Sequence, residues 1–178
     1  MSLSRITQYA YHIISALLVI TLAGVITAGF GYQAIMHQAP CPLCFLQRVA
    51  MIGVALGQVF NFYFGVRMSH HALSLFHCLL GATISLRQIS LHVCPGFSSY
   101  GSPVWGYELY TWALVAFFCS LLTIGALLAL YKPEWKPLHS PFVKRLEQFA
   151  FLYIVIMIVA DLVAAAMICG LGACPDNP

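Results

Sequence analysis

The stretch "YHIISALLVITLAGVITAG" (residues 11–29) decides the fold class, because it holds no Lys, Arg, Asp or Glu over the length of a bilayer crossing. A helix rises about 1.5 Å per residue, so about 20 residues cross the roughly 30 Å hydrocarbon core of a membrane. Further apolar runs of similar length occupy residues 45–66, 72–91, 110–130 and 149–168. The sequence therefore predicts five transmembrane helices.

Composition supports an all-α integral membrane protein. The chain is 61% hydrophobic and 7% charged, whereas soluble domains are about 45–50% apolar and about 25% charged. Five spans with short connections use all 178 residues, so we expect one domain, 1–178. The first run is longer than a signal-peptide core and no A-x-A site follows it, so we expect it to be retained. A net charge of +3 is too small to suggest a nucleic-acid partner.

Orientation follows from the positively charged residues, which gather in cytoplasmic loops. They lie near the amino terminus and in the connections after the second and fourth runs, at Arg5, Arg67, Lys132, Lys136, Lys144 and Arg145. Alternating spans place these segments on one side, so we predict a cytoplasmic amino terminus and a periplasmic carboxyl terminus. The periplasmic side, which is oxidising in a bacterium, then receives five of the seven cysteines, at positions 41, 44, 94, 169 and 174.

The motif "APCPLCFLQR" (residues 39–48) carries a C-x-x-C pair at this outer side. Such a pair can be a metal half-site, a structural disulfide or a redox pair. Zinc normally needs four ligands, and the other Cys and His residues show no matching spacing, so we predict no metal site. A disulfide between Cys41 and Cys44 would close a loop too short to constrain much chain entropy. Redox activity is the favoured interpretation.

The surroundings of Cys44 favour its reactive thiolate form. Pro40 and Pro42 disfavour a helix before the pair, so the second span is expected to begin at Leu43 or Cys44, with the sulfur near a helix amino terminus. Arg48 follows one helical turn later on the same face. A positive helix end and a guanidinium both stabilise a thiolate. The alternative for Arg48 is an arginine that extends to the membrane interface as an anchor.

Net oxidation of thiols needs an electron acceptor outside the thiol pool, because disulfide exchange only moves a disulfide between partners. The sequence shows no haem C-x-x-C-H, no GxGxxG and no iron–sulfur cysteine array. This leaves a lipid-soluble acceptor reached from within the bilayer.

The motif "CPLCFLQR" after a first span, in a small membrane protein with further outer cysteines, resembles the DsbB family of disulfide bond formation proteins. The resemblance implies a four-helix core, here with one helix added, in the bacterial inner membrane. It implies an enzyme that reoxidises a periplasmic, thioredoxin-fold DsbA-like thiol oxidase and passes electrons to membrane ubiquinone or menaquinone. It also implies that Cys44 lies against the quinone, that Arg48 stabilises charge there, and that Cys41 exchanges with a second cysteine pair.

This chain departs from the family pattern at that second pair. Family members usually carry both cysteines in the loop between the third and fourth spans, where this chain has only Cys94. The segment "CGLGAC" after the fifth span instead brings Cys169 and Cys174 to the same side. We take Cys169 and Cys174 as the exchange pair. A bond from Cys94 to one of them is the alternative.

Polar residues near the outer end of the third span are candidates for quinone binding. Gln88 and His92 share one helix face and are placed to bind a quinone carbonyl or pass protons, and Arg87 adds positive charge. Simple interfacial anchoring and interhelical hydrogen bonding remain the alternative for all three. Asp161, in the fifth span, is expected to pair within the bundle or stay protonated, without a catalytic role.

The remaining residues of note have structural interpretations. Cys78 and Cys119 are expected to be small core residues, and His70 and His71 to be solvated on a cytoplasmic turn. The loop after the third span is expected to lie on the membrane surface, with aromatic residues at headgroup level, at Trp105, Tyr107 and Trp112.

Two other functions are compatible with an apolar bundle. A small channel or transporter with structural outer disulfides would place polar residues at the bilayer midplane, whereas here they are expected to cluster at the outer edge. A relay that carries reducing equivalents outward would favour an inner thiol pair, and Cys78 is single. The leading prediction remains a thiol:quinone oxidoreductase.

Overall fold

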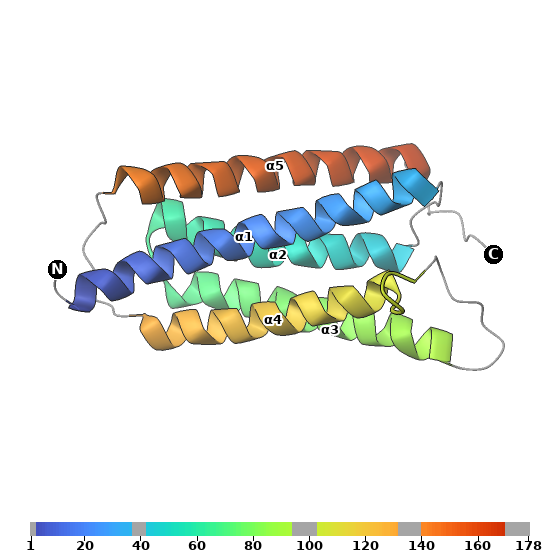
Figure 1. Cartoon of the computed structure of the whole chain (residues 1–178), viewed down its shortest axis with the longest axis horizontal. Helices are drawn as coiled ribbons and strands as arrows, with labels where there is room; N and C mark the ends of the chain where they lie inside the picture. Colours follow the sequence, from blue (N-terminus) through green and yellow to red (C-terminus); the bar gives the residue numbers. More distant parts are fainter. Residues whose placement is uncertain (1–2, 37–41, 94–102, 132–139, 170–178) are drawn as a thin grey trace.

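The computed structural model describes residues 3–36, 42–93, 103–131 and 140–169, and these form an antiparallel bundle of five helices (Figure 1). The helices are α1 (Leu3–Met36), α2 (Pro42–Phe64), α3 (Met68–Val93), α4 (Leu109–Leu130) and α5 (Pro141–Cys169). All five are long and apolar enough to cross a membrane. Over these residues the prediction of an all-helical fold with five helices of membrane-spanning length and hydropathy is confirmed.

The helix ends lie where proline and glycine chemistry places them. Pro42 and Pro141 are the first residues of α2 and α5, a position at which a helix needs no backbone N–H. The second helix therefore starts slightly earlier than predicted. Gly65 follows the last residue of α2 with φ of 80°, a conformation that favours glycine after a helix.

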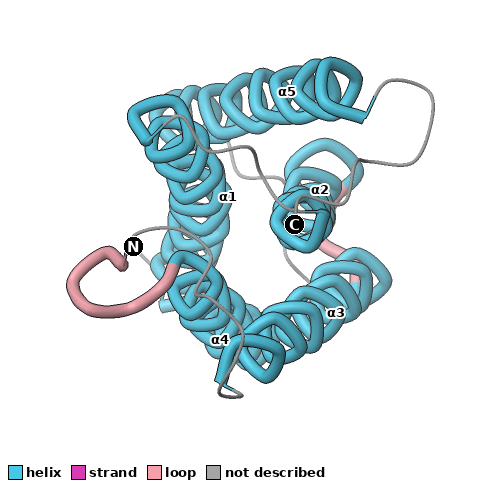
Figure 2. The backbone as a smooth tube through the Cα atoms, turned by 90° about the vertical axis from the view of Figure 1, so that its right-hand side faces the viewer, coloured by secondary structure: helices cyan, strands magenta, loops and turns pink. Residues whose placement is uncertain are grey.

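The second helix is the centre of the bundle. It packs against each of the other four helices, and in the view along the bundle axis it lies between α5 and α3 (Figure 2). Two of its glycines allow α3 to come close. A Cβ on Gly57 would collide with Ser74 and the backbone of His70, and a Cβ on Gly53 would collide with the ring of His77. Small residues at such contacts are the usual means of close helix packing in lipid.

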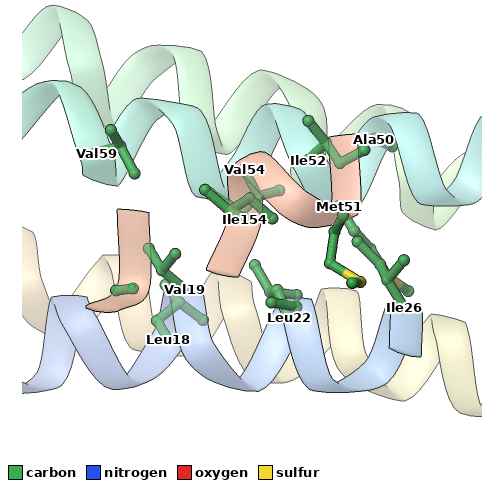
Figure 3. Packing of buried hydrophobic residues seen from close by; sticks show 14 of the residues in the cluster. Leu18, Val19, Leu22, Ile26, Ala50, Met51, Ile52, Val54, Val59 and Ile154 are labelled. Atoms are coloured by element: carbon green, nitrogen blue, oxygen red, sulfur yellow. The ribbon is translucent and has the colours of Figure 1, made fainter. Parts of the chain in front are cut away.

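Apolar side chains from three helices interlock along this axis. Leu22 and Ile26 of α1 face Met51 of α2, and Ile154 of α5 belongs to the same buried cluster (Figure 3). All four are buried, whereas large apolar residues on the outer faces are exposed, among them Phe118 and Leu162. This distribution suits a bundle in lipid, where packing between helices rather than release from water drives assembly.

The end of the bundle opposite to Cys44 contains buried polar contacts that the sequence did not predict. His71, expected to be solvated, is fully buried, and its Nε2 lies 2.6 Å from the hydroxyl of Tyr11. Asn61 contacts the same nitrogen at 3.4 Å, and its Oδ1 lies 3.0 Å from Nδ1 of His70. The prediction of solvation is wrong for His71, because the turn folds this ring against α1.

A second set of polar contacts joins the same three helices nearer the middle of the bundle. Ser15 donates to Gln58 at 2.9 Å, Gln58 donates to Ser74 at 3.0 Å, and Ser74 donates to the carbonyl oxygen of Val54 at 2.8 Å. Polar groups therefore also lie away from the outer edge, contrary to the sequence-based expectation. They satisfy one another between helices, as buried polar groups must.

Candidate functional site

The first turns of α2 place two of the predicted site residues at one end of the bundle. Cys44 is the third residue of the helix and Arg48 lies one turn further on. The helix begins here because Pro42 supplies the backbone angle of a first helical residue without needing a hydrogen bond. Cys41, the other half of the motif, lies outside the described residues.

A cavity of about 310 Å³ opens beside these residues. Most of its wall is apolar and comes from α1, α2 and α4, with Met51 and Ala113 among the contributors. Polar side chains also line it, among them those of Tyr32, Gln33, Cys44, Gln47, Arg48 and Gln88. An apolar pocket with a few converging polar groups is the usual form of a small-molecule site.

Cys44 is contacted by an ordered pair of glutamines. The Nε2 of Gln88, on α3, donates to Sγ of Cys44 at 3.8 Å, and the Nε2 of Gln47 donates to Oε1 of Gln88 at 3.0 Å. Both glutamines are buried. Gln88 was a predicted site residue, whereas Gln47 was not. The sequence singles out Gln47 only as a polar residue within an apolar span, between Cys44 and Arg48.

Arg48 is enclosed within the bundle. Its side chain is 7% exposed, which contradicts the alternative of an arginine extended to the interface. Its Nη2 donates to Oε1 of Gln33 at 2.6 Å, and its guanidinium carbon lies 4.0 Å from the ring centre of Phe30. Its Nη1 lies 3.7 Å from Oδ1 of Asp161, so Asp161 does pair within the bundle. The charge is therefore held between α1 and α5 at the edge of the cavity.

The other two predicted quinone-binding residues lie further away. Arg87 is exposed and His92 is half-buried, and neither lines the cavity. The ring of His92 is stacked on that of Tyr110, with centroids 5.2 Å apart, and its Nδ1 lies 2.7 Å from the carbonyl oxygen of Gln88. Because Tyr110 lines the cavity, His92 supports its wall from behind.

An aromatic turn before α4 covers part of the cavity. Val104 and Tyr107 form an isolated two-residue bridge, and Trp105 between them has φ of 53°. Trp112 donates its ring N–H to the carbonyl oxygen of Val104 at 3.1 Å. Val104, Trp105 and Trp112 all line the cavity. Trp105 is also 86% exposed on its outer side, consistent with the predicted aromatic surface.

The remaining cysteines fall into two groups. Cys169 is the last residue of α5, at the same end of the bundle as the start of α2 (Figure 1). Cys94 and Cys174 lie outside the described residues, so their pairing stays a prediction. Cys78 is buried as predicted, but Cys119 is exposed on the outer face of α4. The prediction of a core residue is wrong for Cys119, because this face of α4 is not covered by another helix.

The described residues contain no cluster of three or more His, Cys, Asp or Glu side chains that could hold a metal ion. The expectation that the site binds no metal therefore stays a prediction from the sequence.

The fold and the site define a class of protein: a multi-pass helical membrane protein with a C-x-x-C cysteine and an enclosed arginine beside an apolar cavity. The family model described as disulfide bond formation protein DsbB matches residues 11–101, just over half of the chain. The protein belongs to the DsbB family and is a membrane oxidoreductase of disulfide bond formation. The match ends before α4. Searches among curated proteins and among solved structures gave no match.

Proposed function

We propose that this protein is a thiol:quinone oxidoreductase that reoxidises a periplasmic DsbA-like protein and passes the electrons to the membrane quinone pool. One observation carries the proposal: Cys44, Arg48 and Gln88 line a single apolar cavity. A thiol, a fixed positive charge and an amide donor thereby converge on one space within the span of α2. This is the arrangement that electron transfer from a thiolate to a lipid-soluble acceptor requires.

The cavity fits a quinone head group in chemistry and in size. Its volume of about 310 Å³ falls at the lower end of small-molecule pockets, which measure about 300–1,000 Å³. The apolar wall suits a ring, and Arg48 and Gln88 offer donors to carbonyl oxygens. Either ubiquinone or menaquinone presents such a ring with two carbonyl oxygens. Arg87 and His92 are proposed to act from outside the cavity. Arg87 adds positive charge near it, and His92 passes protons.

The chemistry of the site is an oxidation of two thiols. Cys41 and Cys44 form a disulfide and release two electrons and two protons, which convert a bound quinone to quinol. Arg48 stabilises the negative charge on the attacking sulfur, and Gln88 donates to the same sulfur. The oxidised Cys41 then accepts electrons from the Cys169/Cys174 pair by disulfide exchange, and that pair oxidises the soluble partner.

The proposed location is the bacterial inner membrane, with the active site toward the periplasm. Arg5 and Arg67, together with Lys144 and Arg145 of α5, lie at the end of the bundle opposite to Cys44. The positive-inside rule assigns that end to the cytoplasm. The cavity then opens on the oxidising side, where a newly formed disulfide persists.

The test is quinone reduction by the purified protein. Reduced DsbA-like protein is supplied together with a soluble ubiquinone or menaquinone analogue, and quinone absorbance and free thiols are followed in the same sample. We expect quinone loss and thiol loss in a ratio of one quinone to two thiols. Thiol oxidation that continues at full rate without any quinone would contradict the proposal.

A further inference from the structure

The acidic residue Asp161 connects α5 to the site. It is one of five acidic residues in the chain, and it lies outside the stretch that the family model matches. Its Oδ1 is 3.7 Å from Nη1 of Arg48, and each of the two side chains is 7% exposed. A carboxylate in a membrane span is costly unless a partner balances it. The pair therefore places a carboxyl group directly beside the arginine of the cavity.

The position of Arg48 does not depend on Asp161 alone. Gln33 accepts a hydrogen bond from Nη2 at 2.6 Å, and the ring of Phe30 lies under the guanidinium at 4.0 Å. By contrast, 3.7 Å between Nη1 and Oδ1 is longer than the 2.7–3.2 Å of a good N–H···O bond. Gln33 and Phe30 therefore help to hold the guanidinium in place, and Asp161 adds a carboxyl group beside it.

We propose that Asp161 is the counter-ion of Arg48 and limits how much of its positive charge reaches Cys44 and the cavity. The inference rests on the proposed function in one respect, since it takes Cys44 as the thiol that faces the quinone. Asp161 is then a tuning residue that acts through Arg48, without contact with the reacting atoms. This gives α5 a role in the chemistry in addition to packing.

The expected consequence is a balance between two requirements of a redox thiol. A stronger positive field favours the Cys44 thiolate, which is the form that reacts. The same field stabilises the reduced pair, so the disulfide becomes a stronger oxidant and the dithiol gives its electrons to quinone less readily. Loss of the Asp161 charge shifts the site toward a more populated thiolate and a slower quinone step.

The test measures the thiolate without any quinone. Full-length protein carrying Cys41→Ser is freed of quinone, reduced, and treated with iodoacetamide at a fixed pH, and mass mapping follows alkylation at Cys44. We expect Asp161→Asn to accelerate this alkylation several-fold and Arg48→Ala to slow it. In the Asp161→Asn/Arg48→Ala double variant the acceleration should disappear, because Asp161 acts through the guanidinium. Double-variant cycles isolate such coupling.

A matched control is available on the same helix. Glu147 is the other described acidic residue of α5, and its Oε1 lies 2.7 Å from Nδ1 of His12. It is about 21 Å from Asp161 along the helix, at 1.5 Å per residue. Glu147→Gln should leave Cys44 alkylation unchanged. Thermal unfolding in detergent checks that Asp161→Asn is folded, and Asp161→Ser serves as a second neutral variant that should also accelerate alkylation.

Several results would overturn the inference. Alkylation that is unchanged or slowed in folded Asp161→Asn would mean that Asp161 only packs or orients Arg48. An acceleration that persists without Arg48, or that Glu147→Gln reproduces, would exclude action through the guanidinium. These measurements need no quinone, so they can refute the inference without refuting the proposed function. The proposed function is refuted if the unmodified protein does not reduce quinone, whatever the alkylation rates are.

Discussion

The side-chain amide of Gln88 points at the sulfur of Cys44 across the α2–α3 interface, with Nε2 3.8 Å from Sγ. Its carbonyl oxygen is engaged by Nε2 of Gln47 at 3.0 Å. With its oxygen turned toward Gln47, the amide presents its N–H donors to Cys44. Gln47 therefore fixes which end of Gln88 faces Cys44. A donor directed at sulfur stabilises the negative charge that forms when the thiol ionises.

This relationship gives the first prediction. Gln88→Leu should lower the rate of quinone-dependent oxidation by about tenfold, which corresponds to about 1.4 kcal/mol, because it removes a donor to a charged sulfur. Gln47→Leu should have a smaller effect in the same direction. Steady-state quinone reduction measures both. The matched control is Gln58→Leu, which removes a buried glutamine of α2 that donates to Ser74 on α3. This variant should leave turnover unchanged. Equal losses in all three variants would indicate a packing defect.

The second prediction concerns the cysteine pair itself. Replacement of Cys41 or of Cys44 by Ser should abolish quinone-dependent thiol oxidation, because neither thiol alone can close the disulfide that releases both electrons. Membrane insertion and thermal unfolding should stay close to those of the unmodified protein. Cys119→Ser, at an exposed site on α4, is the control and should retain full activity. Turnover that survives in either active-site variant would remove the pair from the mechanism.

The third prediction concerns Arg48. Arg48→Ala or Arg48→His should reduce kcat/KM for quinone by roughly 10- to 150-fold, the equivalent of about 1.5–3 kcal/mol for a hydrogen bond to a charged group. Loss of the guanidinium also leaves Asp161 buried without its partner, so part of the damage should appear as lower thermal stability. Kinetics with a series of quinone concentrations separate the two effects. Unchanged KM and turnover would leave Arg48 with a structural role only.

The sequence predicted the helices well and the contacts between them poorly. Hydropathy located each bilayer crossing, but α1 extends from Leu3 to Met36, well beyond the apolar run of residues 11–29. Spacing within one helix placed Arg48 one turn from Cys44. The partners of Arg48 were not predicted, because Gln33 and Asp161 reach it from other helices. Whether Gln33 and Asp161 contact Arg48 depends on how α1 and α5 are rotated and on their depth in the membrane. Packing between the helices determines both.

The fourth prediction concerns the buried polar contacts at the other end of the bundle. Tyr11→Phe removes the hydroxyl that lies 2.6 Å from Nε2 of His71. Interhelical hydrogen bonds in membrane proteins contribute about 0.6 kcal/mol on average and about 1.7 kcal/mol at most, so we expect a loss of stability in that range. Unfolding in mixed detergent measures it. Tyr9→Phe on the same helix is the control. Quinone reduction should be unaffected, because this contact lies far from Cys44.

The last prediction concerns the cysteines at the end of α5. If Cys169 and Cys174 are the exchange pair, a chain that ends at Ile168 should no longer oxidise the soluble partner, while quinone should still oxidise Cys41 and Cys44. The two half-reactions separate, because thiol exchange requires sulfur to meet sulfur in a mixed disulfide. The double variant Cys169→Ser/Cys174→Ser should behave in the same way within the full chain.

The position of α5 gives this route its physical basis. The helix ends at Cys169, at the same end of the bundle as the start of α2 (Figure 1). Cys174 follows after four residues, three of which are Gly or Ala, and an extended chain spans about 3.3 Å per residue. Mass mapping of trapped disulfides decides the pairing. A resting Cys169–Cys174 bond, with a mixed disulfide from Cys41 to one of them in a trapped variant, is the expected result. A resting bond from Cys94 to either cysteine, with activity lost in Cys94→Ser, would contradict it and make the loop and the tail one redox unit.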